Sequence, residues 1–263
     1  MSGVKIKTPA EVAKAREAGK LVAELLAMIG EHMRPGVSTE ELDAICREHI
    51  VKVQRAIPAN IGYYGYPKTI CASVNQVVCH GIPSEKQILQ DGDIVNIDVA
   101  VIKDGWHGDS SRMYFVGAPR PEAKLLVDTC HRAMWAGIRE VRPGATLGDV
   151  GHAIQAVTQQ AGFSVVREYC GHGIGKVYHE EPEVLHYGRR GAGLRLRPGM
   201  VFTIEPMINA GKAPTRQLDD GWTVVTQDGS WSAQWEHMVA VTTQGFEVLT
   251  PWPDGEGGYP AQA

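Results

Sequence analysis

The 263-residue chain repeats part of its own sequence at an offset of 107–108 residues. The segment "MRPGVSTEELDAI" (33–45) aligns with "VRPGATLGDVGHAI" (141–154), and "DGDIVNIDV" (91–99) aligns with "PGMVFTIEP" (198–206). Pro-Gly and Asp-Gly turns also recur by chance, but these segments keep the same order in both copies. An internal repeat of this kind predicts two related α+β halves, each built from the same elements.

Each copy of the repeat has the sequence signs of two consecutive helices. Residues 10–32 and 121–140 are rich in Ala, Leu, Glu and Lys at helical spacing. A Pro-Gly pair follows each segment, and Ser38 and Thr146 then occupy equivalent positions. Hydroxyl residues are preferred at helix N-caps. The sequence therefore predicts a helix, a turn and a second helix in each half.

Residues 93–117 predict a β-hairpin that carries two aspartates. β-branched runs lie on either side of a Lys-Asp-Gly turn. A two-residue loop at 103–104 would put Asp98 and Asp109 directly opposite each other, and a loop shifted by one residue would make them diagonal neighbours on the same face. Like charges this close destabilise a covered sheet unless a cation neutralises them. The pair therefore favours a metal site over an exposed acidic surface.

The second half offers two further acids and an imidazole near strand-like segments. Glu205 ends the apolar run "MVFTI", and Glu236 lies in the alternating segment "WSAQWEHMVAVTT". His172 belongs to "GHGIGKVYHEEP", in which His179 follows seven residues later. Each of these residues alone is more often a solvated loop or strand-end residue than a ligand. Together with the hairpin aspartates they suit two bridged divalent ions, and oxygen ligands with one imidazole fit Mn, Fe, Co or Zn equally.

Composition argues against several other classes of function. The net charge of −4 disfavours a nucleic-acid or anionic-membrane partner, since both need a basic surface. No apolar run is long enough to span a bilayer, and the first residues lack a signal-peptide pattern. The five cysteines are scattered without a C-x-x-C pair, as is usual for free thiols in a reducing compartment. We therefore expect a cytoplasmic protein with no direct nucleic-acid or membrane partner.

Five segments, in this order, resemble the motifs of type I methionine aminopeptidases: "GYYGYPKTICASVNQVVCHGIP", "NIDVAVIKDGWHGDSSRMYFVG", "GHGIGKVYHEEP", "FTIEPMINAG" and "SAQWEHMVAVTT". The resemblance implies the α+β pita-bread fold, in which two pseudo-symmetric halves and a central antiparallel sheet surround a dinuclear metal site. The expected organisation is one catalytic domain over residues 1–250, with pseudo-repeats at about 10–117 and 121–245. The Pro/Gly-rich residues 251–263 have no counterpart and are expected to be a flexible tail, and residues 1–8, which lack apolar periodicity, are also expected to be flexible.

The resemblance also implies a role for each matching residue in catalysis. Five positions match the metal ligands of that family: Asp98, Asp109, His172, Glu205 and Glu236. Asp109 and Glu236 would bridge the two ions, and Glu205 would also carry a proton toward the leaving amine. His80 matches the group that contacts the scissile amide nitrogen, and His179 matches the group that stabilises the tetrahedral oxyanion.

Eight positions match the substrate site of the family: Asn60, Tyr63, Tyr66, Cys71, His80, Tyr178, His179 and Trp222. Asn60 stands where a cysteine is often found and Tyr178 where a phenylalanine is common, so both add polarity beside a thioether pocket. Some members hold a monovalent cation, Na or K, at three further positions: Asn75, Val77 and Ser232.

The implied reaction is removal of the N-terminal methionine from nascent proteins and peptides with a small second residue, by attack of metal-activated hydroxide. Nascent N-termini are the implied partners, with the ribosome as a candidate place of encounter, and we expect a monomer. Two alternatives stay open: a proline-directed aminopeptidase of the same fold, and a non-catalytic binding protein built on that fold. Enzymes of the first class usually carry an extra N-terminal domain, and proteins of the second class typically lose metal ligands.

Overall fold

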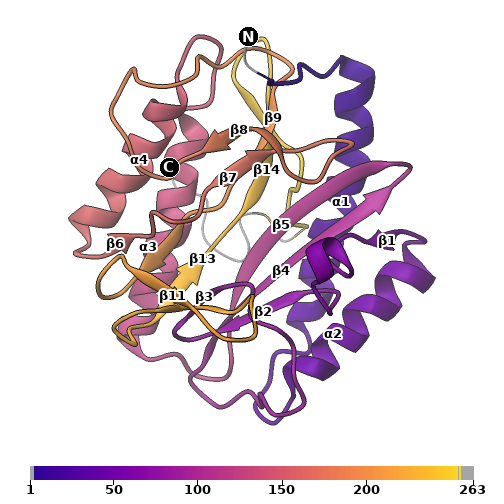
Figure 1. Ribbon diagram of the computed structural model, residues 1–263, viewed down its shortest axis with the longest axis vertical. Helices are drawn as coiled ribbons and strands as arrows, with labels where there is room; N and C mark the ends of the chain where they lie inside the picture. Colours follow the sequence, from indigo (N-terminus) through magenta and orange to yellow (C-terminus); the bar gives the residue numbers. More distant parts are fainter. Residues whose placement is uncertain (1–2, 254, 256–263) are drawn as a thin grey trace.

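The computed structural model describes residues 3–253 and residue 255, and within them the chain forms four α-helices and fifteen β-strands (Figure 1). The helices are α1 (Pro9–Gly30), α2 (Thr39–Glu48), α3 (Pro121–Arg139) and α4 (Leu147–Gln160). A π-helical turn (His49–Val53) continues α2, and a 3₁₀ turn covers Tyr63–Gly65. The strands are β1 (Ile57–Pro58), β2 (Cys71–Val74), β3 (Val77–Cys79), β4 (Ile94–Lys103), β5 (Trp106–Phe115), β6 (Ser164–Val165), β7 (Gly171–Gly173), β8 (Glu180–Val184), β9 (Val201–Ile204), β10 (Met207–Asn209), β11 (Thr215–Gln217), β12 (Val224–Thr226), β13 (Ser232–Gln234), β14 (His237–Val241) and β15 (Phe246–Val248).

Helices α2 and α4 begin with the same capping arrangement. In α2 the Ser38 hydroxyl accepts the Glu41 N–H, and the Glu41 carboxylate accepts the Ser38 N–H. In α4 Thr146 and Asp149 make the same reciprocal pair. Each pair satisfies two of the N–H groups that the start of a helix leaves free. The N-caps predicted at Ser38 and Thr146 are confirmed.

The turns before these two helices also match each other. Gly36 and Gly144 have φ angles of 91° and 88°, in the left-handed region that glycine adopts without strain. Their N–H groups donate to the carbonyls of Leu89 and Leu196 at 2.9 and 3.0 Å. The repeat in the sequence is therefore also a repeat of hydrogen bonds, and the expected pair of pseudo-symmetric halves is confirmed.

The long hairpin β4–β5 decides between the two predicted registers. Its loop falls at 104–105, where both residues have positive φ (50° and 77°), as in the turn type that suits the twist of a hairpin. Asp98 therefore pairs with Ser111, and Asp109 pairs with Ala100. The two aspartates are diagonal neighbours on one face. The directly opposite arrangement was wrong, because the left-handed pair of residues lies one position later than that arrangement requires.

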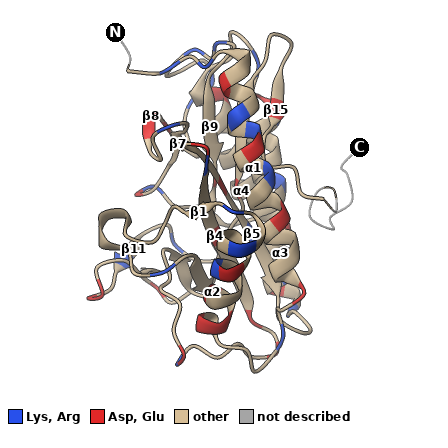
Figure 2. Ribbon diagram, turned by 90° about the vertical axis from the view of Figure 1, so that its right-hand side faces the viewer, with Lys and Arg blue, Asp and Glu red and all other residues tan. Residues whose placement is uncertain are grey.

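Hydrogen bonding divides the expected central antiparallel sheet into four smaller sheets. Their strand orders are β1-β4-β2 with β5 paired to β4, β15-β14-β9-β7-β8, β13-β10-β6 and β11-β12-β3. Paired strands are antiparallel, as in β4–β5 and β9–β14. Helices α1, α3 and α4 lie together along one side of the strands, with β8 and β11 on the opposite side (Figure 2). The α+β class and the strand direction are confirmed.

Each half packs its helices on its own strands, and the core of the second half also includes Ala23, Ile94 and Met113 of the first half. In the first half α1 and α2 pack on β4 through buried residues that include Leu42 and Ile97. In the second half α3 and α4 pack on β9 and β14 through buried residues that include Ile154 and Phe202. A third, smaller cluster, which includes Trp106, joins β5 to β14. The halves thus meet along their strands, and α1 also contacts the second half through the ion pair between Arg16 and Glu247.

Residues 3–8 are held against the second half, so the expected flexibility of the N-terminal segment is wrong for the part described. The Lys7 N–H donates to the Gly199 carbonyl at 2.7 Å. The Lys7 ammonium forms a buried ion pair with Glu180, and the Lys5 ammonium lies 3.1 Å from the other oxygen of that carboxylate. Apolar periodicity was a poor guide here because backbone and ionic contacts, rather than an apolar face, fix the segment.

The expectations about the two ends of the chain lie largely outside the described residues. Of the predicted tail at 251–263 only residues 251–253 and 255 are described, and residues 1–2 are not described. The single catalytic domain over 1–250 and the bounds of its two pseudo-repeats stay predictions. No helix in the described part of the chain has the length and apolar character needed to cross a membrane.

Candidate active site

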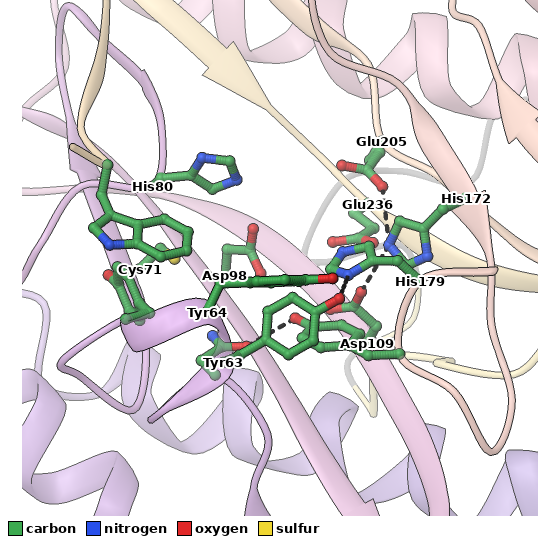
Figure 3. Close-up of a pocket in the computed structure, with 14 residues that line it drawn as sticks. Tyr63, Tyr64, Cys71, His80, Asp98, Asp109, His172, His179, Glu205 and Glu236 are labelled. Atoms are coloured by element: carbon green, nitrogen blue, oxygen red, sulfur yellow. Dashed lines mark hydrogen bonds and ion pairs between the residues drawn. The ribbon is translucent and has the colours of Figure 1, made fainter. Parts of the chain in front are cut away.

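Four carboxylates and one imidazole converge between the two halves (Figure 3). Asp98 and Asp109 come from β4 and β5, His172 comes from β7, and Glu205 and Glu236 flank the paired ends of β9 and β14. His172 Nε2 lies 3.4 Å from Asp109 Oδ2 and 3.7 Å from Glu205 Oε1. Ligand atoms of Asp109, His172 and Glu236 lie within 4.8 Å of one another. The structure thus brings all five predicted metal ligands, called the acid cluster below, to one cavity.

Hydrogen bonds across the two halves hold the acid cluster in place. Asn96 Nδ2 donates to Ser111 Oγ at 3.2 Å and to the Gln234 carbonyl at 2.7 Å. The Glu236 N–H donates to the Ser111 carbonyl at 3.1 Å, and the Ser110 hydroxyl donates to the Glu236 carbonyl at 2.6 Å. Because these hydrogen bonds connect β5 to the segment before β14, they hold the acids of the two halves in fixed positions relative to each other.

Glu205 and His172 are each oriented by neighbouring polar groups. The Thr203 hydroxyl donates to Glu205 Oε1 at 2.7 Å and accepts the His172 N–H at 2.9 Å. Gln234 Nε2 donates to the other Glu205 oxygen at 3.3 Å, and the Glu205 N–H donates to His186 Nε2 at 3.1 Å. His172 Nδ1 lies 3.0 Å from the next carbonyl along the chain. An Nδ1–H donated to that carbonyl leaves Nε2 free to face the carboxylates, as in metal-binding histidines.

The acid cluster carries more negative charge than the surrounding protein neutralises. Burial raises the pKa of Glu205 to about 7, against the opposing effect of His172. Burial, and then the neighbouring carboxylates, also hold the pKa of Asp98 and of Glu236 well above the usual range. Asp109 Oδ1 and Glu236 Oε1 are buried and accept no hydrogen bond. Buried acceptors without donors are costly, so the residues present fit divalent cations, for which carboxylates and imidazole are ordinary ligands.

A cavity of about 180 Å³, the aromatic cavity, is lined by the acid cluster and by side chains from both halves. The further lining residues are Asn60, Tyr63, Tyr64, Tyr66, Cys71, His80, Tyr178, His179 and Trp222. All eight predicted substrate residues are among them, and Tyr64 was not predicted. The Tyr66 hydroxyl donates to backbone carbonyls at 3.0 and 3.1 Å, and its ring meets the Trp222 ring edge-on at 5.1 Å. Such a wall suits an unbranched, polarisable side chain.

The two residues that depart from the usual pocket pattern bind each other. The Tyr178 hydroxyl donates to Asn60 Oδ1 at 2.7 Å, and both residues are buried. Most of the polarity predicted at these positions is therefore paired within the wall. The amide nitrogen of Asn60 is the exception, because it is buried and donates no hydrogen bond.

His179 is a neutral imidazole in hydrogen-bonding distance of a tyrosine hydroxyl. Its ring lies 4.1 Å from the His172 ring and stacks on Tyr178 at 4.2 Å. Burial, and then the neighbouring imidazoles, lower the pKa of His179 to about 3. The Tyr63 hydroxyl lies 2.6 Å from His179 Nδ1. The direction of this hydrogen bond depends on the tautomer of His179, and a phenol that donates to Nδ1 leaves the imidazole proton on Nε2.

A second cavity, of about 560 Å³, adjoins the same carboxylates. Five residues line both cavities: His80, Asp98, His172, His179 and Glu205. In Figure 3 His80 and His179 lie on different sides of Asp98. Burial lowers the pKa of His80, so this imidazole is also neutral near pH 7. Several acids line the outer part of the second cavity: Glu168, Glu181 and Glu183.

Two contacts that support His179 could not be seen in the sequence. His107 in β5 stacks on Tyr178 at 5.4 Å, and its N–H donates to the Gly175 carbonyl at 2.8 Å. Glu180, for which the sequence indicated only surface charge or a supporting hydrogen bond, follows His179 directly and holds the buried ion pair with the N-terminal segment. By contrast, Thr203 had a usable signal, since it lies two residues before Glu205 and so on the same face of the strand.

The three residues predicted to hold a monovalent cation are not part of the aromatic cavity. Asn75 has φ of 53°, and its carbonyl accepts the Ser232 N–H at 2.8 Å, so two of the three are neighbours. Val77 opens β3 nearby in the chain. The Asn75 side chain donates to the Asp93 carboxylate at 2.8 Å. Cation binding at Asn75, Val77 and Ser232 stays a prediction.

Known proteins share this geometry and sequence. Residues 13–243 match the model of metallopeptidase family M24. The chain is 55% identical to the methionine aminopeptidase of Escherichia coli (strain K12) over 247 residues, which cover 94% of each chain. A crystal structure of methionine aminopeptidase from Rickettsia prowazekii matches with a TM-score of 0.92 and 53% identity, over 94% of this chain and 99% of that chain. A prolidase from Pyrococcus furiosus matches with a TM-score of 0.74 and 21% identity, over 93% of this chain and 65% of that chain, which is a likeness of fold alone.

Proposed function

This chain belongs to metallopeptidase family M24 and has the pita-bread fold, and we propose that it removes the N-terminal methionine from polypeptides with a small second residue. The observation that carries this proposal is the position of the acid cluster beside a small aromatic cavity. Its substrates are the N-termini of nascent polypeptides, met in the cytoplasm and in part at the ribosome, and it acts as a monomer.

The acid cluster is suited to hold two divalent ions, with Asp109 and Glu236 as the bridging residues. Divalent ions bound there would activate water as a nucleophile and polarise the carbonyl of the first residue. The two buried acceptor atoms without donors, one on each bridging residue, support this assignment. Mn, Fe, Co and Zn all suit a set of carboxylates with one imidazole. A monovalent cation, Na or K, would lie apart from this centre, at the residues named above.

The neighbouring side chains supply hydrogen bonds and move a proton. His179 donates its Nε2–H to the carbonyl oxygen as negative charge develops on it, and Tyr63 keeps the proton on that nitrogen. Glu205 passes a proton toward the leaving amine, for which a carboxyl group with a raised pKa is suited. His80 contacts the scissile amide nitrogen from the side of the larger cavity.

Each cavity binds a different part of the substrate: one binds the first residue, and the other binds the rest of the chain. The aromatic cavity receives the methionine side chain, since tyrosine, tryptophan and thiol groups pack well against a thioether. The larger cavity receives the second residue and the chain beyond it. The aromatic cavity is smaller than the other cavity, about 180 against 560 Å³, which supports cleavage at the terminus only.

Hydrolysis of short peptides tests this proposal against its alternatives. The metal-loaded protein, assayed anaerobically with Mn, Fe, Co or Zn, should release methionine from Met-Ala-Ser and leave Met-Leu-Ser intact. Cleavage of Ala-Pro peptides without cleavage of Met-Ala-Ser would support a proline-directed enzyme. Absence of both metal binding and hydrolysis would support a non-catalytic binding protein.

A further inference from the structure

The indole of Trp252, in the segment after β15, is buried behind one of the two bridging residues of the acid cluster. Trp252 is 4% exposed, and the centre of its ring lies 3.9 Å from that of His237 and 5.1 Å from that of Trp235. These two residues are the neighbours of Glu236 on either side in the chain. The Glu236 side chain lines the aromatic cavity, whereas Trp235 belongs to the core beneath α3 and donates its Nε1–H to the Val127 carbonyl at 3.1 Å. Trp252 therefore supports both neighbours of Glu236 from the side away from the cavity.

The same indole also contacts the strand of the other bridging residue. The guanidinium carbon of Arg112 in β5 lies 5.6 Å from the centre of the Trp252 ring, in a cation–π contact. Arg112 follows Asp109 by three residues, so strand alternation puts these two side chains on opposite faces of β5. Tyr114 shares the face of Arg112, and its hydroxyl donates to the Leu26 carbonyl of α1, so this face is the one covered by a helix. Trp252 thus spans the rear of both segments that carry the bridging residues.

Hydrogen bonds to β14 fix the segment that carries Trp252. The Thr250 hydroxyl accepts the Met238 N–H at 3.1 Å, and its oxygen lies 3.0 Å from His237 Nδ1. The Leu249 N–H donates to the Met238 carbonyl at 2.8 Å. Because its own backbone is anchored in this way, the indole can resist movement of the residues that it covers.

The other contacts of Glu236 do not replace this support. Its N–H donates to the Ser111 carbonyl, and its carbonyl accepts the Ser110 hydroxyl. Both bonds join the two backbones side by side, whereas the indole packs on the face away from the cavity. Close-packed interiors relax into space left by a lost side chain, and such relaxation would move Glu236 relative to Asp109. Ligand atoms tolerate shifts of only a fraction of an ångström before metal binding suffers.

We propose that Trp252 is a positioning residue for the metal centre, which fixes Asp109 and Glu236 relative to each other from the face away from the cavity. This inference rests on the proposed function, since it takes these two residues as ligands shared by two ions. Within the described chain Trp252 lines neither of the two cavities, so it acts through the geometry of the ligands and not by contact with substrate. Loss of a residue that orients metal ligands typically lowers metal affinity by about 10–100-fold.

The experiment titrates the protein with Co(II) alone, anaerobically, and follows the visible absorption of the bound ion. The titration gives the dissociation constant, and the spectrum of the saturated protein reports the geometry of the ligands. The variants are Trp252→Ala, which removes the indole, and Trp252→Phe, which keeps a flat ring in its place. Leu42→Ala is the matched control, since it removes a fully buried side chain from the core beneath α2, a different core from that of Trp252. Trp252→Leu replaces Trp252→Ala if urea unfolding shows that the alanine variant is not folded.

The dissociation constant for Co(II) should rise roughly tenfold or more in Trp252→Ala, and the spectrum of the saturated variant should differ from that of the parent. Trp252→Phe should restore the parent spectrum, because a ring still packs on His237 and Trp235. Leu42→Ala should lose stability but keep the dissociation constant within about threefold of the parent, since distant sites act independently.

A parent-like dissociation constant and spectrum in Trp252→Ala, or an equal loss of affinity in Leu42→Ala, would overturn the inference. A parent protein that binds no Co(II) would overturn the proposed function itself, and the inference with it.

Discussion

The first half of the molecule carries its two residues of the acid cluster on one hairpin, whereas the second half carries its three on separate short strands. In the first half, ten-residue strands carry Asp98 and Asp109 across a two-residue loop. In the second half, β7 carries His172, and Glu205 and Glu236 lie just beyond the ends of β9 and β14. The two halves of the repeat thus differ: the first carries its acids on a regular hairpin, and the second carries them on an irregular set of short strands.

In the second half, β9 and β14 pair as the two arms of a hairpin do, but a long segment takes the place of the short loop. Strands β9 and β14 pair with Ile204 opposite His237, and the next step of this register puts Glu205 opposite Glu236. In place of a two-residue loop, the chain between them runs through β10–β13 and supplies Trp222 to the aromatic cavity. The comparison shows how a duplicated element can keep its acids in place while its loop builds a substrate site.

The largest expected effect tests whether the two halves contribute equally to metal binding. Asp109→Asn and Glu236→Gln should each abolish turnover of Met-Ala-Ser and lower the bound metal, because a neutral amide is a poor bridge between two cations. Asp104→Asn makes the same chemical change in the exposed loop of the first hairpin and serves as the matched control. Elemental analysis and peptide hydrolysis measure the outcome. Either bridging variant with full metal and normal turnover would contradict the shared site.

The next effect separates the ligands from the group that binds the oxyanion. His179→Ala should lower kcat for Met-Ala-Ser by about 10²–10³ with the metal content unchanged, as when one oxyanion donor is removed from other hydrolases. Both quantities are measured on the same preparation. Loss of metal from this variant would make His179 a ligand and move one more metal-binding residue to the second half.

Metal removal should expose the free-energy cost of burying ionised acids between the two halves. Burial raises the pKa of Glu205 to about 7 in the folded protein, so the folded state keeps a proton that the unfolded state releases above its ordinary pKa of 4.5. The contribution of Glu205 to the stability of the metal-free protein is therefore greatest below pH 4.5. This contribution is lost as the pH rises from 4.5 toward 7. The expected loss is about 3 kcal/mol for this residue, and Asp98 and Glu236 change stability in the same direction.

Urea unfolding at pH 5 and pH 7.5, in EDTA and with saturating metal, measures this loss. The metal-loaded protein should not show it, since bound cations replace the protons. Equal stability of the metal-free protein at both pH values would mean that Glu205 is not buried as the structure has it.

The smallest effect concerns the contact between the N-terminal segment and the second half. Lys7→Met breaks a buried ion pair with Glu180, but Lys5 still lies beside that carboxylate, so the expected loss of stability is about 2 kcal/mol. Lys5→Met removes an exposed partner of the same carboxylate and should cost less than about 1 kcal/mol. Urea unfolding of both variants with metal present gives the comparison. Equal losses would show that burial of the Lys7 pair contributes nothing.

The regular features of both halves could be predicted from the sequence because local rules determine them. The caps at Ser38 and Thr146 depend on residues within one turn of a helix, and the β4–β5 hairpin depends on one short loop. The face shared by Asp98 and Asp109 followed from strand periodicity, but their diagonal register required the position of that loop.

Local sequence rules could not predict contacts between segments that are far apart in the chain. Lys7 and Glu180 are 173 residues apart, and the Tyr178–Asn60 pair is 118 residues apart. Neither pair has a local pattern, because each depends on how the N-terminal segment and the first half pack on the loop after β7. The resemblance to a known family placed both pocket residues in the right cavity, but it could not indicate that they bind each other or that one amide end is left unpaired.

The hydrophobic cores of the two halves have a consequence for how the molecule unfolds. The largest core includes Ala23, Ile94 and Met113 of the first half beside the residues of the second half, so loss of one half would remove buried contacts from the other. Ions held by acids from both halves would bind only when both are folded, and so each tenfold excess of ion over its Kd adds about 1.4 kcal/mol to their joint stability. Metal concentration would then set how strongly the two halves are held together as one cooperative unit.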